Sequence, residues 1–78
     1  MKMHVISRSN DTLAGFRLGG VAGTNVSDEA QLEECLDALL SGDETGVILI
    51  SRDIYEMGED IISRKMRDRR LPILVTIE

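Results

Sequence analysis

The sequence lacks most of the residues on which metal, cofactor and disulfide chemistry depends. Its 78 residues include one cysteine, one histidine, one tyrosine and one phenylalanine, and no tryptophan. A single cysteine cannot form an internal disulfide, and one histidine with one cysteine gives no metal-ligand spacing. With so few aromatic rings, the bases of a single-stranded nucleic acid have almost nothing to stack on. We therefore expect no metal, no cofactor and a reducing, cytosolic location.

Long apolar runs and an excess of positive charge are missing as well. The longest unbroken apolar run is Val47–Ile50, so we expect no segment that spans or inserts into a bilayer. The first seven residues are too short and too soon polar for a secretory signal. Fourteen acidic and nine basic side chains give a formal net charge of −5. Because phosphate contacts need a basic surface, this balance predicts no nucleic-acid partner.

The charged residues are unevenly spread along the chain. Between residues 28 and 44 every charged residue is acidic, namely Asp28, Glu29, Glu33, Glu34, Asp37, Asp43 and Glu44. A later segment holds the bases Arg64, Lys65, Arg67, Arg69 and Arg70, with Asp68 as its one acid. One or two bases complement the negative end of a helix dipole. The excess predicts contact with an acidic surface, and dipole compensation remains the structural alternative.

The N-terminal part predicts a strand followed by a helix. Met3–Ile6 is short and apolar, which favours a first strand. A helix is expected to follow through Leu18, with Asn10 or Asp11 as its cap, because either side chain can accept amide hydrogens of the first turn. Gly19-Gly20 ends this helix, since glycine adopts the left-handed cap conformation without steric cost.

A glycine-weakened strand and an amphipathic helix are predicted next. Val21–Val26 contains glycine and asparagine, which are poor in strands, so it predicts a short edge strand. Ser27 is the expected cap of a second helix, which Gly42 closes. The buried stripe of this helix follows i, i+3, i+4, i+7, i+8 spacing and comprises Leu32, Cys35, Leu36, Leu39 and Leu40.

The C-terminal half predicts a central strand, a third helix and a last strand. Gly46–Ile50 is apolar on both faces, as a parallel strand covered by helices is. Ser51 is expected to cap a helix, with Gly58 in its buried stripe permitting close packing on the sheet. The other members of this stripe are Ile54, Met57, Ile61 and Ile62. Pro72 prevents continuation of the helix, and Ile73–Ile77 is the expected last strand.

Strands and helices thus alternate, which predicts a single α/β domain over residues 1–78. Right-handed crossovers then place a four-stranded parallel sheet between helices, as a three-layer sandwich with three helices. The first and third strands are expected at the centre, and the second and fourth at the edges. The predicted strand order is 2-1-3-4, as in flavodoxin-like and Rossmann-like folds.

The places where such folds carry chemistry hold no catalytic set. Those places are the carboxyl ends of the strands, beside the switch in strand order. Ser7-Arg8-Ser9 follows the first strand and Asp53 falls in the first turn of the third helix, so the carboxylates of a phospho-acceptor receiver are missing. The early glycines lie at the wrong end of the first helix for a dinucleotide fingerprint, and no lysine stands beside a glycine loop. We expect no catalytic and no cofactor-binding residue.

Three features have both a structural and a functional interpretation. Ser7, Ser9 and Asn10 at a helix start could hold an anion, although capping and turn polarity explain them too. Cys35 lies on a leucine stripe and is expected to be a buried structural thiol. His4 lies within a strand and is expected to be half-buried with its hydrogen bond satisfied, rather than a ligand or base.

Three stretches of the sequence resemble one family. Asp11-Thr12-Leu13-Ala14-Gly15-Phe16-Arg17-Leu18-Gly19-Gly20-Val21 is similar to the F subunit of the rotary V/A-type ATPases, which carries Asp-Thr, Gly-Phe and Leu-small-Gly here. Gly46–Ser51 followed by Ile54 resembles the third strand of that family and the helix entry after it. Leu71–Ile77 resembles its Leu-Pro-led fourth strand. Together these stretches follow the order of the family along the whole chain.

Two departures from the family pattern accompany the resemblance. The family usually has Gly-Asp after the first strand, where this chain has Ser7–Asn10. Family members also continue past the fourth strand into a C-terminal segment linked to control of ATP hydrolysis, whereas this sequence stops at Glu78.

The resemblance implies a non-catalytic central-stalk component of a proton- or sodium-translocating V/A-type ATPase. Such a component binds the coiled-coil D subunit of the rotor, lies near the catalytic-head subunits, and couples ATP hydrolysis or synthesis to rotation. It also implies a cytoplasmic location, peripheral to the membrane. The candidate partner-contact residues are Phe16, Arg17, Tyr55, Arg64, Arg67, Arg69 and Arg70. The alternative is a small flavodoxin-like module that binds an anion or phosphate at Ser7–Asp11 for signalling or transfer.

Overall fold

The computed structural model describes residues 2–77, in which strands and helices alternate along the chain. The elements are β1 (Lys2–Ser7), α1 (Asn10–Leu18), β2 (Ala22–Asn25), α2 (Glu29–Leu40), β3 (Thr45–Ser51), α3 (Arg52–Met57), α4 (Glu59–Met66) and β4 (Ile73–Ile77). The strand order in the sheet is β2-β1-β3-β4, and every pairing is parallel. The predicted α/β class, strand order and edge strands are therefore confirmed.

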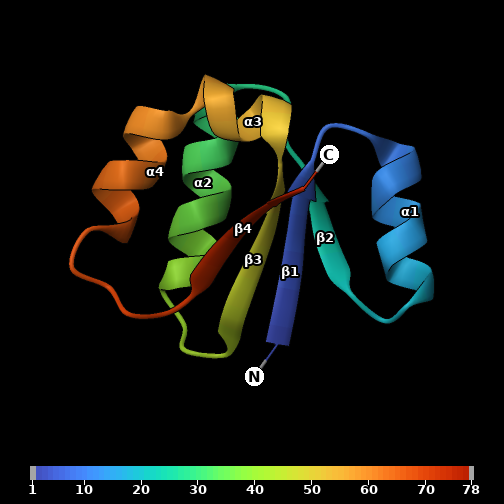
Figure 1. Cartoon of the computed structure of the whole chain (residues 1–78), viewed down its shortest axis with the longest axis horizontal. Coiled ribbons are helices and arrows are strands. Elements are labelled where there is room, and N and C mark those ends of the chain that lie inside the picture. Colours follow the sequence, from blue (N-terminus) through green and yellow to red (C-terminus); the bar gives the residue numbers. More distant parts are fainter. Residues whose placement is uncertain (1, 78) are drawn as a thin grey trace.

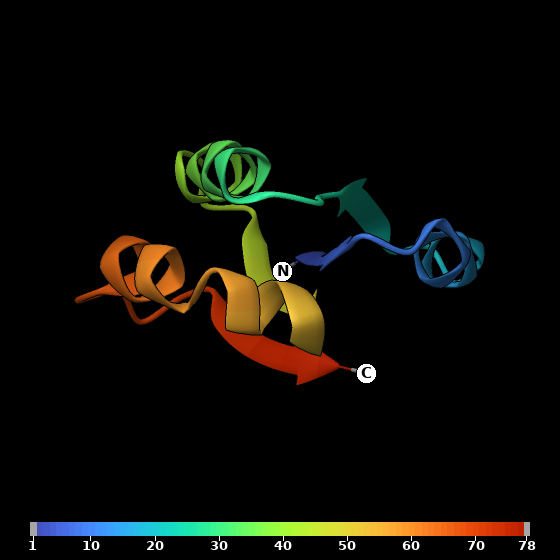
Figure 2. The same cartoon turned by 90° about the horizontal axis from the view of Figure 1, so that it is seen from above.

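The helices cover the two faces of the sheet unequally. Helices α2 and α4 lie on one side of the sheet, and α1 lies alone on the other side (Figures 1 and 2). Helix α1 packs mainly against β2 and β1, whereas α3 contacts β3 and β4 at the carboxyl end of the sheet. The predicted three layers are present, and one outer layer consists of the single helix α1.

The larger part of the core lies between the sheet and helices α2, α3 and α4. Its fully buried strand residues are Ile6, Ile48 and Ile50, which alternate with residues of the other face. The predicted stripe of α2 faces this core, with Leu32, Cys35 and Leu36 buried and Leu39 and Leu40 half-buried. A smaller cluster on the α1 side contains the buried residues Val5, Leu13 and Leu49.

The cap of α1 differs from the prediction by one residue. Ser9, rather than Asn10 or Asp11, occupies the cap, and its hydroxyl oxygen accepts a hydrogen bond from the Thr12 amide at 3.2 Å. The reason is tertiary, because the side-chain oxygen of Asn10 instead accepts a bond of 2.8 Å from the Asn25 amide group. That contact ties the end of β2 to the start of α1.

The caps of the next two helices also differ from the predictions. Asp28, not Ser27, caps α2, with its carboxylate accepting from the Gln31 amide at 2.8 Å. The amide and hydroxyl of Ser27 both donate to the Gln31 side-chain oxygen, which holds Ser27 just outside the helix. Ser51 does precede α3, but its hydroxyl donates to the Ile6 carbonyl at 3.4 Å instead of capping the helix.

The predicted third helix is in fact two helices, α3 and α4, which meet at Gly58. The backbone of Gly58 has φ −117° and ψ 29°, so the helix is interrupted there. A Cβ atom at this position would collide with Leu32 Cδ2 of α2. Close packing at Gly58 is thus confirmed, but its partner is α2 and not the sheet. The break lets α3 lie over the end of the sheet while α4 packs beside α2 (Figure 1).

The glycines around β2 have two separate roles. Gly20 has φ +88°, the left-handed conformation predicted at the end of α1. A Cβ atom at Gly23 would lie 2.6 Å from Val5 Cγ1 and 2.8 Å from Leu13 Cδ2. Glycine in this short strand therefore lets α1 approach the sheet, which explains a residue that otherwise weakens a strand.

Candidate functional site

Two of the five bases of residues 64–70 have structural partners. Lys65 Nζ lies 2.8 Å from Asp37 Oδ1 and 3.2 Å from Glu33 Oε2, so this side chain joins α4 to the acidic side of α2. Hydrogen bonds to Asp37 and then Glu33 raise the pKa of Lys65 above its usual range. Arg69 donates from Nη2 to the Leu40 carbonyl at 3.0 Å, at the C-terminal end of α2.

Three other bases of this segment remain directed to solvent. Arg64 lies in the last turn of α4, Arg67 ends that helix, and Arg70 lies in the connection to β4. All three are exposed, and they form no ion pair within residues 2–77. Arg64 and Lys65 also suit the dipole of α4. The dipole interpretation thus accounts for part of the cluster and leaves Arg67 and Arg70 as surface charge.

The remaining candidate contact residues lie in other places. Phe16 is half-buried on α1 and packs against the cluster around Val5 and Leu49, while Arg17 is exposed in the last turn of α1. Tyr55 on α3 is half-buried against the larger core. Because α1 and α4 lie on opposite sides of the sheet, the candidate residues form separate groups (Figure 1).

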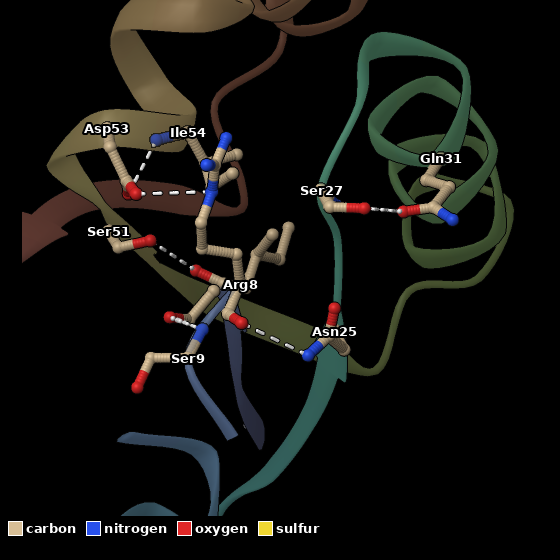
Figure 3. Close-up of polar contacts among 10 residues, drawn as sticks. Arg8, Ser9, Asn25, Ser27, Gln31, Ser51, Asp53 and Ile54 are labelled. Atoms are coloured by element: carbon tan, nitrogen blue, oxygen red, sulfur yellow. Dashed lines mark hydrogen bonds and ion pairs between the residues drawn. The ribbon is translucent and has the colours of Figure 1, made fainter. Parts of the chain in front are cut away.

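A hollow of about 370 Å³ lies at the carboxyl ends of β1 and β3, where an anion site was the alternative. Several of the groups that line it have partners within the fold (Figure 3). Ser7 Oγ accepts from the Ser9 amide at 3.0 Å, and Arg8 Nε lies 3.4 Å from Asp53 Oδ2. The other Asp53 oxygen accepts from the Ile54 amide at 2.8 Å.

This pairing argues against an anion at the same place. Arg8 already faces the carboxylate of Asp53, and the hollow is also lined by a second arginine, Arg52, and a second carboxylate, Glu56. An incoming anion has to displace Asp53 and approach Glu56, and like charges repel. The two carboxylates therefore offset the two arginines, and the geometry does not favour the anion-binding alternative.

A groove of about 470 Å³ between β1, β2 and α2 contains the single histidine and the single cysteine. His4 Nε2 lies 2.8 Å from Thr24 Oγ1, and burial lowers the pKa of His4. Burial also raises the pKa of the Cys35 thiol, which a hydrogen bond with Thr24 partly offsets and the charge of Glu34 reinforces. The thiol stays protonated and is a poor nucleophile. Both expectations, a satisfied histidine and a buried structural thiol, are confirmed.

The sequence analysis missed an exposed apolar surface beside α1, which we call the open face. It consists of Met3 on β1, Val47 on β3, and Ile73 and Val75 on β4. Met3 is 44% exposed, Ile73 53% and Val75 42%. The predicted topology already implied that part of this face is uncovered, because right-handed crossovers in the order 2-1-3-4 place only the first helix on it.

Two kinds of feature are missing from the described part of the chain. Residues 2–77 hold no group of three or more histidine, cysteine or acidic side chains placed to bind a metal ion. The helices within these residues are also too short or too polar to cross a bilayer.

Known proteins share both the sequence pattern and the fold. The sequence model of the ATP synthase (F/14-kDa) subunit matches residues 3–78. The F subunit of the V-type ATP synthase of Thermus thermophilus is 28% identical over 67 residues, which are 86% of this chain and 64% of the relative. The crystal structure of the F subunit of the V-type ATP synthase from Archaeoglobus fulgidus has 18% identity and a TM-score of 0.79, over 99% of this chain and 96% of that one. The family match covers nearly the whole sequence. It shows that the chain belongs to the family of the ATP synthase (F/14-kDa) subunit.

Proposed function

We propose that the chain is a non-catalytic part of the central stalk of a V/A-type ATPase. There it binds the coiled-coil D subunit of the rotor, turns with it and couples ATP hydrolysis or synthesis to rotation, on the cytoplasmic side of the membrane. The observation that carries the proposal is the family match over residues 3–78. The chain spans 64% of the length of the Thermus protein, so the proposal concerns the domain that these residues form.

The contacts of the polar residues support a role in binding rather than in catalysis. The serines and the arginine at the carboxyl end of the sheet serve the fold, since they bond to backbone groups and to Asp53. The Cys35 thiol is kept in its unreactive form by burial. The groups from which an active site would be built are thus already engaged in holding the domain together.

The basic end of α4 supports contact with an acidic partner. Arg67 and Arg70 are exposed and free of ion pairs within residues 2–77, whereas Lys65 and Arg69 hold α4 and its connection to α2. Peripheral charges of this kind act mainly on the rate of association. We propose that Arg64, Arg67 and Arg70 attract an acidic surface of the D subunit or of the catalytic head.

Co-purification tests the proposed function directly. The purified chain, mixed with the D subunit from the same source, should elute as one complex in size-exclusion chromatography. Separate elution at micromolar concentration would overturn the assignment to the stalk. In a parallel assay, the chain alone should not turn over Mg-ATP. A rate that disappears with a point substitution in this chain would overturn its non-catalytic role.

Charge reversal tests the contribution of the basic residues. Arg67→Glu should slow association with the D subunit at low ionic strength and reduce the salt dependence of the rate. Arg52→Glu is the matched control, because Arg52 is an exposed arginine on α3 and its reversal changes the net charge equally. Equal association rates for the two folded variants would show that these arginines do not attract the partner, and would leave helix-dipole compensation as their role.

A further inference from the structure

The charged side chains of residues 2–77 are divided between the two ends of the sheet. All strands are parallel, so the chain enters every strand at one end of the sheet, the amino end, and leaves it at the other, the carboxyl end. The carboxyl end, with the first helical turns and all of α3, holds seven acids and two bases, namely Asp11, Asp28, Glu29, Asp53, Glu56, Glu59, Asp60, Arg8 and Arg52. The amino end, with the last helical turns, holds seven bases and three acids, namely Lys2, Arg17, Arg64, Lys65, Arg67, Arg69, Arg70, Asp43, Glu44 and Asp68. The domain is acidic overall but has one basic end.

Helix dipoles and internal contacts account for only part of the basic end. Bases in a last helical turn are stabilising, as at the ends of α1 and α4. Lys2 pairs with Glu44 at 3.4 Å, and Arg69 donates to a backbone carbonyl at the end of α2 at 3.0 Å. Arg67 and Arg70 follow α4, are exposed, and form no ion pair within residues 2–77. These two charges are available to a partner.

Two connections carry exposed arginines at opposite edges of this end (Figure 1). The connection from α4 to β4 carries Arg67 and Arg70, and the hydrogen bond of Arg69 holds it beside the end of α2. Arg17 precedes β2, and its carbonyl accepts from the Gly20 amide at 2.9 Å in the turn that leads to that strand. Strands β2 and β4 are the two edges of the sheet, and neighbouring strands lie about 4.8 Å apart, so roughly 14 Å separates the two connections across the sheet.

An exposed leucine follows an exposed arginine in each of these connections. Leu18, after Arg17, is 92% exposed, more than any other large apolar side chain of residues 2–77. Leu71, after Arg70, is 48% exposed. Neither leucine belongs to a core cluster of the domain. We call the two Arg-Leu pairs, together with Arg67, the amino-end surface.

We propose that an acidic surface of the coiled-coil D subunit contacts the amino-end surface, and that the acidic carboxyl end of the domain points away from it. An acidic partner is attracted to one end of the sheet and repelled by the other, which orients the domain as it approaches. Leu18 and Leu71 lose their contact with water at the two edges of the interface. The inference rests on the proposed function, and it adds the end of α1 to the surface that the partner uses.

A second copy of this chain is a poorer occupant of the amino-end surface. Its acidic carboxyl end has the complementary charge, but such a contact is head-to-tail and leaves the outer ends free to add further copies. Each copy also carries a formal net charge of −5, so two copies repel each other at a distance. The surface therefore fits a different chain better.

Charge reversal at the two ends of the sheet tests the orientation. Arg17→Glu changes the amino end at the edge far from α4, and Arg52→Glu makes the same change of charge at the carboxyl end. At about 0.1 M salt the Debye length is about 10 Å, shorter than the domain, whose extents are 32 × 27 × 18 Å. Stopped-flow association with the D subunit should therefore be slowed about 5-fold by Arg17→Glu and less than about 1.5-fold by Arg52→Glu. Circular dichroism first establishes that both variants fold.

Removal of the exposed leucine tests the contact itself. Leu18→Ala should weaken binding to the D subunit about 10-fold in calorimetry, as expected for an apolar side chain buried at an interface. Its stability in urea should stay close to that of the unaltered chain, because Leu18 is 92% exposed. Val75→Ala is the matched control, since it shortens a partly exposed apolar side chain of β4 outside the amino-end surface, and it should change binding less than about 2-fold.

The outcomes separate this inference from the proposed function. Slow association of Arg17→Glu but not of Arg52→Glu, with weak binding of Leu18→Ala, supports both. Binding of the unaltered chain that neither Arg17→Glu nor Leu18→Ala changes overturns the inference and leaves the proposed function standing.

Three further results contradict the inference. Equal slowing by Arg17→Glu and Arg52→Glu means that net charge alone sets the rate, and it overturns the orientation. Self-association of the chain in sedimentation that Leu18→Ala abolishes assigns the surface to a second copy. Failure of the unaltered chain to bind the D subunit overturns both the inference and the proposed function.

Discussion

The face of the sheet under α2 and α4, which we call the closed face, and the open face beside α1 are built from alternate residues of the same strands. On the closed face Ile6, Ile48 and Ile50 are fully buried. On the other side burial ends at Leu49, and Val75 of the neighbouring strand is partly exposed. The two faces are equally apolar in sequence, because β3 reads Gly-Val-Ile-Leu-Ile along its centre.

The difference shows that the strands carry more apolar side chains than the domain buries. Burial of apolar area stabilises a fold by about 25 cal/mol per Å², and an exposed valine or isoleucine supplies little of that. The closed face therefore supplies the larger part of the burial that stabilises the domain, and the cluster around Val5, Leu13 and Leu49 supplies the rest.

The largest expected effect separates the two faces by stability. Ile50→Ala removes a fully buried side chain from the closed face and should cost about 4 kcal/mol of unfolding free energy. Val75→Ala on the open face should cost less than about 1 kcal/mol, because solvent already reaches the side chain. Urea unfolding of the two variants and the unaltered chain checks this. Similar losses for both would show that the open face contributes to the core after all.

Glycines on the two sides of the molecule give the next comparison. Gly58→Ala should destabilise the domain by about 2–3 kcal/mol, because its new methyl group meets the buried Leu32 side chain on the closed face. Gly15 lies in the middle of α1 with nothing within 4 Å of its Cβ position. Gly15→Ala, the matched control, should stabilise by about 0.5–1 kcal/mol through helix propensity. Opposite shifts in the thermal midpoint are expected, and shifts of the same sign would contradict the packing difference.

Cys35 tests the closed face where it meets the groove. Cys35→Ser buries a hydroxyl group in a largely apolar site and should cost about 1–2 kcal/mol, and a hydrogen bond to Thr24 limits the loss. Because burial raises the pKa of the thiol, labelling of native Cys35 by a thiol reagent should be much slower than labelling in urea. Equal labelling rates in the two conditions would place the thiol on the surface.

The layout of strands and helices was predictable from sequence because it depends on local patterns. Alternating elements, glycine stops and the weak Val21–Val26 segment were enough for the order 2-1-3-4, now confirmed. The capping residues were not predictable in the same way, since adjacent serine, asparagine and aspartate have similar propensities. Tertiary contacts decide between them, as Asn25 does by engaging Asn10.

The candidate site depended still more on tertiary structure. The sequence showed five clustered bases but not their partners, because Glu33 and Asp37 lie on α2, far away along the chain. The same holds for the break at Gly58, which reflects the approach of Leu32 from another helix. The packing of α4 on α2 thus decides which of these bases pair within the fold and which remain exposed.

The smallest effect concerns His4, a half-buried residue of β1 on the closed face, next to the edge strand β2. Its side chain bonds to the Thr24 hydroxyl, and burial holds the pKa of His4 below its usual value of 6.5. As the pH falls through about 6.5, the unfolded chain takes up a proton on this residue before the folded chain does. The contribution of His4 to stability is therefore fully present above that pH and is lost progressively below it.

His4→Gln isolates this contribution, because glutamine can bond to Thr24 but does not titrate. Urea unfolding at pH 7.5 and 5.5 should show a larger loss of stability on acidification for the unaltered chain than for the variant. The carboxylates titrate in both proteins and cancel in the difference. An equal loss in both would mean that His4 is as well solvated in the folded chain as in the unfolded one.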